Sequence, residues 1–165
     1  MLPDDLVQFL HGPLIFGLGT RSARLRPAMG RAMGAFVDGP RDRISFFLPN
    51  VQGEPHLTNL SDNGMVALSA GEARSHRNYQ FKGRAIEVRA STAADAAIRD
   101  LYRDKLIRYF REEYFMPLPD EFIGGYIADP STTVTFRVAK IFNQTPGPNA
   151  GRPIEFVATE DQVRV

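Results

Sequence analysis

The chain has 165 residues with 20 basic and 19 acidic side chains, a formal net charge of +1, and no cysteine. That length suits one domain with a sizeable core, and we treat residues 1–165 as a single domain. Without cysteine, disulfides, thiolate nucleophiles and zinc–thiolate sites are excluded. Binding of duplex nucleic acid needs a concentrated basic surface, which a net charge near zero does not indicate. We therefore expect no nucleic-acid partner.

The apolar runs and the histidines argue against two further classes of protein. The run from Leu14 to Leu18 is far shorter than the ~20 residues that cross a bilayer, so we expect no membrane partner. The segment from Met1 to Asp5 is acidic where a secretory signal is basic, which favours a cytoplasmic protein. His11, His56 and His76 show no metal-ligand spacing, and we expect no metal site.

Helical patterns flank and interrupt a chain that is otherwise rich in strand signals. Thr92 and Asp95 make a capping box at the start of the longest helical pattern, in which apolar residues recur at helical spacing. A Pro- and Gly-rich stretch after Phe142 begins a C-terminal arm, about 144–165. The predicted helices are 3–11, 52–63, 92–113 and 121–127.

Short apolar or alternating runs between turn signals predict six strands. Gly39-Pro40 and Asn63-Gly64 are the clearest breakers between them. No GxGxxG follows a strand, so a Rossmann fold is excluded. Short connections of the antiparallel type favour a closed or nearly closed barrel. The predicted strands are 14–20, 26–38, 43–48, 65–70, 78–91 and 132–142.

The second predicted strand has one face of very small residues. Glycine weakens a strand unless something approaches its backbone closely. Either a flat ring lies on this face, or the glycines permit barrel bending or sheet-to-sheet contact. Arg31, on the opposite face, is either an anion anchor or a solvated charge. The small residues that share one parity are Ala28, Gly30, Ala32 and Gly34.

Polar residues elsewhere suggest where a ligand could bind. Asn78, Gln80 and Lys82 share one face of the fifth strand, as in a strand that lines a wet cleft or in a solvated edge strand. Arg74 to Arg77 could meet a phosphate or form plain surface. The amides that begin the helix near Gln52 could bind an anion. His56, one turn later, either joins them or is half-buried surface.

Taken in order, these motifs resemble the pyridoxamine 5′-phosphate oxidase-like, FMN-binding split-barrel proteins. The resemblance covers about Pro13 to Ala90, and its specificity lies in the order and spacing of short motifs. The long helix and the last strand follow in the expected order. The motifs are Ile15–Thr20, Arg26-Pro27, Phe46–Pro49, Leu57–Gly64, Met65–Leu68 and Asn78–Ala85.

The resemblance implies a mainly β fold with flanking helices, a six-stranded antiparallel split β-barrel, and FMN bound at the interface of a homodimer. It places Arg31 at the FMN and the next three residues beside the isoalloxazine. It also places Asn78 near the flavin across the dimer. The resemblance and the polar patterns above together predict the cofactor-binding residues Arg31, Ala32, Met33, Gly34, Phe47, Leu48, Gln52, His56, Asn78 and Gln80.

The sequence departs from the family where the oxidases grip the FMN phosphate with a basic pair. Here that stretch reads Glu54-Pro55-His56, so the phosphate must meet Gln52, His56, helix amides or the segment Arg74–Arg77. The substrate-binding tryptophan is also missing, so true pyridoxamine-phosphate oxidase activity is not expected. The expected function is an FMN-dependent oxidoreductase acting on an unidentified small molecule. The alternatives are a non-catalytic flavin- or haem-binding protein and a deazaflavin-dependent reductase.

Overall fold

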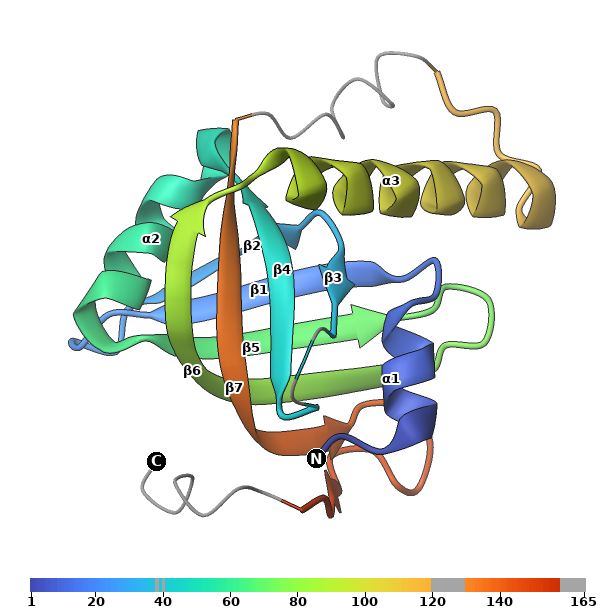
Figure 1. The fold of residues 1–165 in the computed structure, drawn as a ribbon. Helices are drawn as coiled ribbons and strands as arrows, with labels where there is room; N and C mark the ends of the chain where they lie inside the picture. The colour runs from blue at the N-terminus through green and yellow to red at the C-terminus, as the bar shows by residue number, and fades with distance from the viewer. Residues whose placement is uncertain (38, 40, 120–129, 158–165) are drawn as a thin grey trace.

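The computed structural model describes residues 1–37, 39, 41–119 and 130–157 as one curled antiparallel sheet with helices outside it (Figure 1). The predicted helix at 121–127 lies outside the described residues. The elements are α1 (Asp4–Leu10), β1 (Ile15–Arg21), β2 (Pro27–Ala32), β3 (Ala35–Phe36), β4 (Arg43–Pro49), α2 (Asn50–Asn63), β5 (Met65–Gly71), β6 (Asn78–Ala90), α3 (Ala93–Glu113), β7 (Ser131–Asn143) and β8 (Pro153–Ile154).

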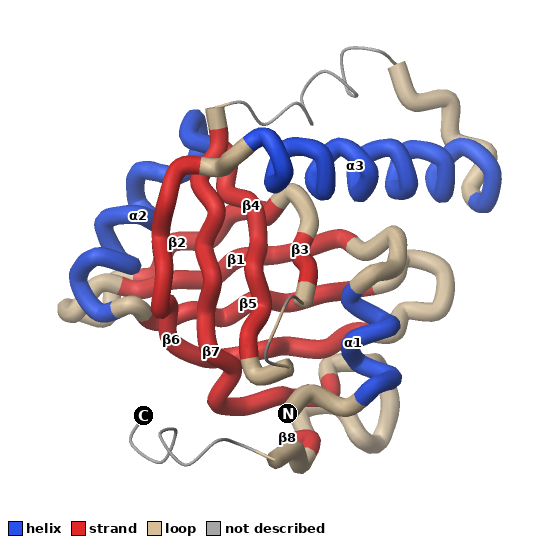
Figure 2. The backbone as a smooth tube through the Cα atoms, in the orientation of Figure 1, coloured by secondary structure: helices blue, strands red, loops and turns tan. Residues whose placement is uncertain are grey.

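The sheet is a split barrel in which the strands run β2-β1-β5-β6-β7-β4-β3, with β8 added beside β7. Every pairing in it is antiparallel. Figure 2 shows the two halves of the sheet crossing each other, with β6 and β7 bending through both. The predicted fold class, mainly β with flanking helices, is confirmed.

The described residues form eight strands rather than the predicted six, and the chain breaks the second predicted strand at Gly34. This glycine has φ +102°, which L side chains rarely adopt, so the chain turns there and divides 26–38 into β2 and β3. The Met33 amide donates to the Phe47 carbonyl (2.8 Å), which joins the break to β4. The eighth strand, β8, lies inside the predicted C-terminal arm.

The core fills the inside of the curled sheet with large apolar side chains. Inward residues alternate with outward ones along β1 and β5, as period-2 patterning requires. From α1, Leu6 and Leu10 add to the same cluster at one end of the barrel. The aromatic rings at its centre are Phe16, Phe46, Phe81 and Phe136, each almost completely buried.

The two longer helices cover different parts of the sheet. α2 begins at Asn50, slightly earlier than predicted, and packs on β1, β2 and β4. α3 has the predicted capping box of Thr92 and Asp95, and its Leu106 packs with Met33 and Phe47. None of the described helices is long and apolar enough to cross a membrane.

Candidate functional site

The central part of the outer surface of β1 and β5 carries only small outward residues, although larger ones stand at the ends of both strands. We call this surface, formed by Gly17, Gly19, Ala67, Ser69 and Gly71, the flat face. Their neighbours in sequence point inward and are buried, which leaves the small residues facing out. The Ser69 hydroxyl donates weakly to the Gly17 carbonyl at 3.4 Å. A planar group could therefore approach this backbone closely.

The pairing register places two predicted ligand residues on opposite sides of the flat face. Gly17 pairs with Arg31 on β2 and with Ser69 on β5, and Ser69 pairs with Gln80 on β6. Directly paired residues share a face, so these four side chains form one row across four strands. The Arg31 side chain is exposed, and Gln80 is half-buried. The row thus joins a cation and an amide across a small-residue floor.

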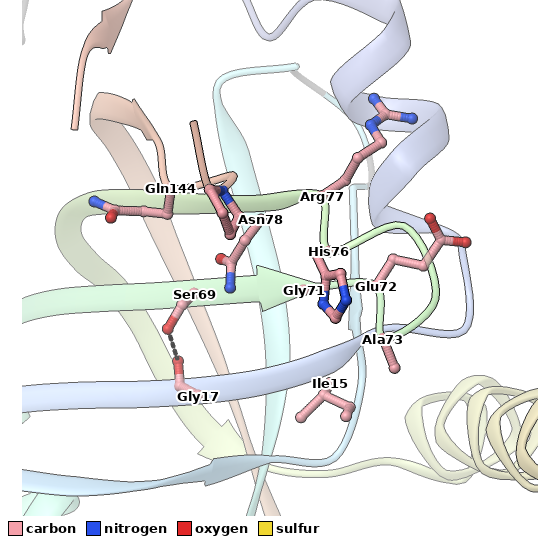
Figure 3. A pocket seen from close by; sticks show the side chains of 11 residues that line it. Ile15, Gly17, Ser69, Gly71, Glu72, Ala73, His76, Arg77, Asn78 and Gln144 are labelled. Atoms are coloured by element: carbon pink, nitrogen blue, oxygen red, sulfur yellow. Dashed lines mark hydrogen bonds between the residues drawn. The ribbon is translucent and has the colours of Figure 1, made fainter. Parts of the chain in front are cut away.

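A pocket of about 420 Å³ opens where the flat face meets the loop between β5 and β6 (Figure 3). Asn78 lies at this end of β6, so the structure brings it and Gln80 to the same face. The lining is amphipathic, with a hydroxyl, two amides, an imidazole, a carboxylate and a guanidinium beside apolar groups. The residues that matter for hydrogen bonding are Ser69, Glu72, His76, Asn78 and Gln144.

The backbone of Asn78 is fixed on both sides by hydrogen bonds to the segment that follows β7. Its backbone amide donates to the Thr145 hydroxyl (3.0 Å), and its carbonyl accepts from the Gln144 amide (2.7 Å). Its side-chain nitrogen would lie only 3.0 Å from a Cβ on Gly71, so the glycine makes room for it. Among the described residues, its Oδ1 is buried without a hydrogen-bond partner. The backbone of Asn78 is therefore fixed, while its side-chain oxygen has hydrogen-bonding capacity unused.

The predicted cationic segment Arg74–Arg77 does not converge on one point. The Arg74 amide donates to the Tyr109 hydroxyl (3.0 Å), and its guanidinium pairs with Glu113 on α3. Arg77 borders the pocket, but its guanidinium lies 5.1 Å from the centre of the Phe9 ring and, in Figure 3, points toward α1. His76, with φ +57°, remains at the pocket. Of this segment, the His76 imidazole lies at the pocket, whereas the guanidinium groups of Arg74 and Arg77 contact residues of α3 and α1.

Five predicted residues lie in the interior, and the chain's own side chains fill the small face of β2. A Cβ on Gly34 would lie 2.9 Å from the Tyr102 ring, and a Cβ on Gly30 would lie 2.5 Å from His56 Nε2. Gly34 and Gly30 therefore make room for side chains of α3 and α2, a role that neither interpretation above had proposed. At these two positions the chain's own rings occupy the space next to the backbone. The five buried residues are Ala32, Met33, Gly34, Phe47 and Leu48.

His56 is also directed inward, away from the predicted phosphate contact. Only 2% of the residue is exposed, its Nδ1 lies 3.0 Å from the Thr20 hydroxyl, and its ring bonds to the Met29 backbone. Asn59 donates to the same Thr20 oxygen (3.0 Å). Burial lowers the pKa of His56 below its ordinary value of 6.5, so the ring stays neutral near pH 7. The side chain of Gln52 lies outside the described part of the chain.

Two contributors to the pocket had no role in the sequence-based hypothesis. Ser69 alternates with buried residues of β5, and Gln144 follows β7, more than sixty positions further along the chain. A signal for Ser69 existed, because Gly17 and Gly19 show the same small outward pattern on another strand. Gln144 carried no such pattern, and only pairing of β6 with β7 brings it to Asn78.

Comparisons with known proteins agree on the fold. No family model and no curated protein matches the sequence. An F420 reductase structure is similar at 17% identity and TM-score 0.53, covering 85% of this chain and 98% of that one. HupZ of Group A Streptococcus gives 17% and 0.54, covering 92% and 100%. A pyridoxamine 5′-phosphate oxidase-related, FMN-binding protein from Nostoc punctiforme gives 10% and 0.50, covering 90% and 87%.

Proposed function

From the split-barrel fold that this chain shares with pyridoxamine 5′-phosphate oxidase-like FMN-binding proteins, we propose that it binds a flavin and catalyses a redox reaction of a small molecule. The flavin supplies the electron-transfer chemistry. The observation that carries the proposal is the row of Arg31, Gly17, Ser69 and Gln80, which ends beside the Asn78 pocket. FMN is the proposed flavin.

The residues of this surface fit a flavin ring. The flat face has no large side chain at Gly17, Gly19 or Ala67, so a ring could lie against the sheet. Asn78 and Gln80 offer amides that can pair with the carbonyl and imide edge of a flavin, because each amide both donates and accepts. Arg31 adds a fixed positive charge on the other side of the floor.

We further propose that two copies of the chain share this site, in a cytoplasmic homodimer. A ring lying on the flat face of one chain would have its other side exposed to water. A second chain would cover it and exclude water from the reaction. The exposed Met29, whose sulfur would lie 3.5 Å from a Cβ on Gly19, adds apolar surface at the edge of this contact.

A deazaflavin-dependent reductase is the second candidate, because an F420 reductase has the same fold. Its cofactor has a ring of similar shape and a longer anionic tail. Both cofactors would use the same floor and amides. A non-catalytic flavin- or haem-binding protein remains the alternative without turnover.

The absorption spectrum of the purified protein, with extraction of any bound cofactor, tests the proposal. We expect a flavin spectrum that bleaches on anaerobic photoreduction and returns when a small-molecule acceptor is added. A deazaflavin spectrum would select the second candidate, and a Soret band would select haem binding. A protein that is colourless as purified and binds neither FMN nor F420 on titration would contradict the proposed function.

A further inference from the structure

Five cations gather on the outer side of β6, β7 and β4, although they are scattered over the sequence. Arg137 on β7 pairs directly with Arg43 on β4 and with Arg84 on β6. One row along, Lys82 pairs directly with Lys140. We call these five side chains the basic face.

This arrangement has an electrostatic cost that the chain itself offsets only in part. Like charges directly opposite each other in a sheet are destabilising. Among the described residues, Lys82, Arg84 and Lys140 form no ion pair with a carboxylate. Lys82 instead lies 4.9 Å from the centre of the Phe142 ring. Glu155 follows β8, whose Ile154 pairs with Ile141, the residue after Lys140.

Asp42 organises the two arginines without removing their exposure. This buried carboxylate lies 3.3 Å from Arg137 Nε and 3.6 Å from Arg43 Nε. The side chains of Arg137 and Arg43 remain 29% and 38% exposed. Both guanidinium groups thus lie within ion-pair distance of one carboxylate, on two side chains that are direct partners across β4 and β7. Two adjacent guanidinium groups are well suited to binding phosphate oxygens.

The size of the basic face matches a small anion. Neighbouring strands are about 4.8 Å apart and alternate residues about 7 Å apart, so the face measures roughly 10 by 7 Å. That area accommodates one or two phosphate groups, whereas a nucleic acid needs a longer track of cations. The charge is also too concentrated for a two-fold contact, which would place cations of two copies against each other.

The basic face continues directly from the flat face. Lys82 pairs with Ala67, which in turn pairs with Gly19. One row of directly paired residues therefore runs from the flat face into the basic face. From Asn78 to Lys82 the strand advances about 13 Å. In FMN a ribityl chain separates the ring from the phosphate. A ring beside Asn78 and Gln80 would therefore extend its tail toward Lys82 and Lys140.

We propose that the basic face binds the anionic tail of the flavin cofactor, with Lys82 and Lys140 making the first contacts and Arg84 and Arg137 the next. The inference rests on the proposed function and specifies how that site holds a phosphate. It replaces the sequence-based assignment of the phosphate to His56, which is buried, and to Arg74, which pairs with α3. The shared chemistry is a phosphate or phosphodiester, carried by FMN or by F420.

The test compares FMN with riboflavin, which has the same ring and lacks the phosphate, by titration of flavin fluorescence. We expect the wild-type protein to bind FMN at least tenfold more tightly. The double variant Lys82→Gln/Lys140→Gln should bind FMN about as weakly as riboflavin, with riboflavin binding unchanged. Lys82→Arg should retain the preference because it keeps the charge. Lys105→Gln is the matched control, because Lys105 lies on α3 and is the only lysine of the chain outside the basic face. This variant should behave as wild type.

The outcomes separate this inference from the proposed function. Equal binding of FMN and riboflavin by the wild type, or a preference that survives the double variant, would overturn the inference and leave flavin binding intact. Tighter binding of F420 than of FMN, lost in the same variant, would assign the tail to a deazaflavin. Lysine-dependent binding of single-stranded DNA, with no preference between the flavins, would overturn the inference.

If neither flavin nor F420 binds, the proposed function fails, and thermal unfolding with inorganic pyrophosphate decides whether the face binds anions. A rise in Tm for the wild type that is absent from the double variant would support an anion site. No rise in the wild type would overturn it.

Discussion

Arg31 is the exposed cation at the edge of the flat face, and its position suggests a direct role in cofactor binding. Its partner across β1 is Gly17, so no bulky side chain separates it from a ring on that floor. Arg31→Ala should weaken FMN binding by roughly 1.5–3 kcal/mol, the value of one charge-assisted hydrogen bond. Isothermal titration would measure this, with Arg24→Ala in the exposed turn as the control. Unchanged affinity in a folded Arg31→Ala variant would place Arg31 in the solvated surface.

His56 predicts a pH dependence of stability. Burial holds its pKa below 6.5 in the folded chain, so the unfolded chain takes up the proton first as the pH falls. The stabilising contribution is complete above pH 6.5 and is lost as the pH falls toward the lowered pKa. Urea unfolding at pH 7.5 and 5.5 should show a larger loss for the wild type than for His56→Gln. Equal losses would mean that protonation of His56 is not coupled to unfolding.

At the scale of elements, the break between β2 and β3 depends on Gly34. Alanine there would adopt an unfavourable φ of +102° and place its Cβ 2.9 Å from Tyr102. Backbone strain and overpacking should together cost about 2–4 kcal/mol of the free energy of unfolding. Gly151→Ala is the control, because Gly151 has φ +81° with nothing within 4 Å of the added Cβ.

Urea unfolding of both variants would separate the two costs at Gly34. A loss for Gly34→Ala no larger than that for Gly151→Ala would show that contact with Tyr102 contributes nothing. The sequence predicted a single strand at 26–38 because small residues keep one parity from Ala28 to Gly34. The positive φ of Gly34, with pairing to β1 before it and to β4 after it, divides that strand in the structure.

At the scale of the whole molecule, the flat face predicts the oligomeric state. Sedimentation at micromolar concentration should give about twice the chain mass of 18.4 kDa. Ala67→Arg would place a bulky cation at the centre of the flat face beside Lys82, and should yield a monomer that no longer retains flavin. Thr58→Arg, on the exposed side of α2, is the matched control. A monomeric wild type would contradict both the dimer and the shared site.

Much of the fold was predictable because its signals are local. Alternation, turn residues and the Thr92–Asp95 capping box each act within a few positions, so the order of strands and helices could be inferred from the sequence. That Asn78 and Gln80 share a face was predicted in the same way, since residues two apart on a strand point to the same side. Parity does not say which face is inside, however, and the small residues of β2 proved to face the chain's own helices.

The sequence by itself therefore determined most of the elements, their order and the barrel class, while the tertiary structure divided one strand, added β8 and decided which residues meet. The basic face is the clearest case. Arg43, Arg84 and Arg137 lie in three distant segments of a chain with a net charge of +1, and strand pairing alone brings them together. His56 and Gln144 show the same limit, because burial and proximity depend on contacts between residues far apart in the chain. Patterns within a few residues predict secondary structure, whereas this binding surface forms only when strands far apart in the sequence pair with each other.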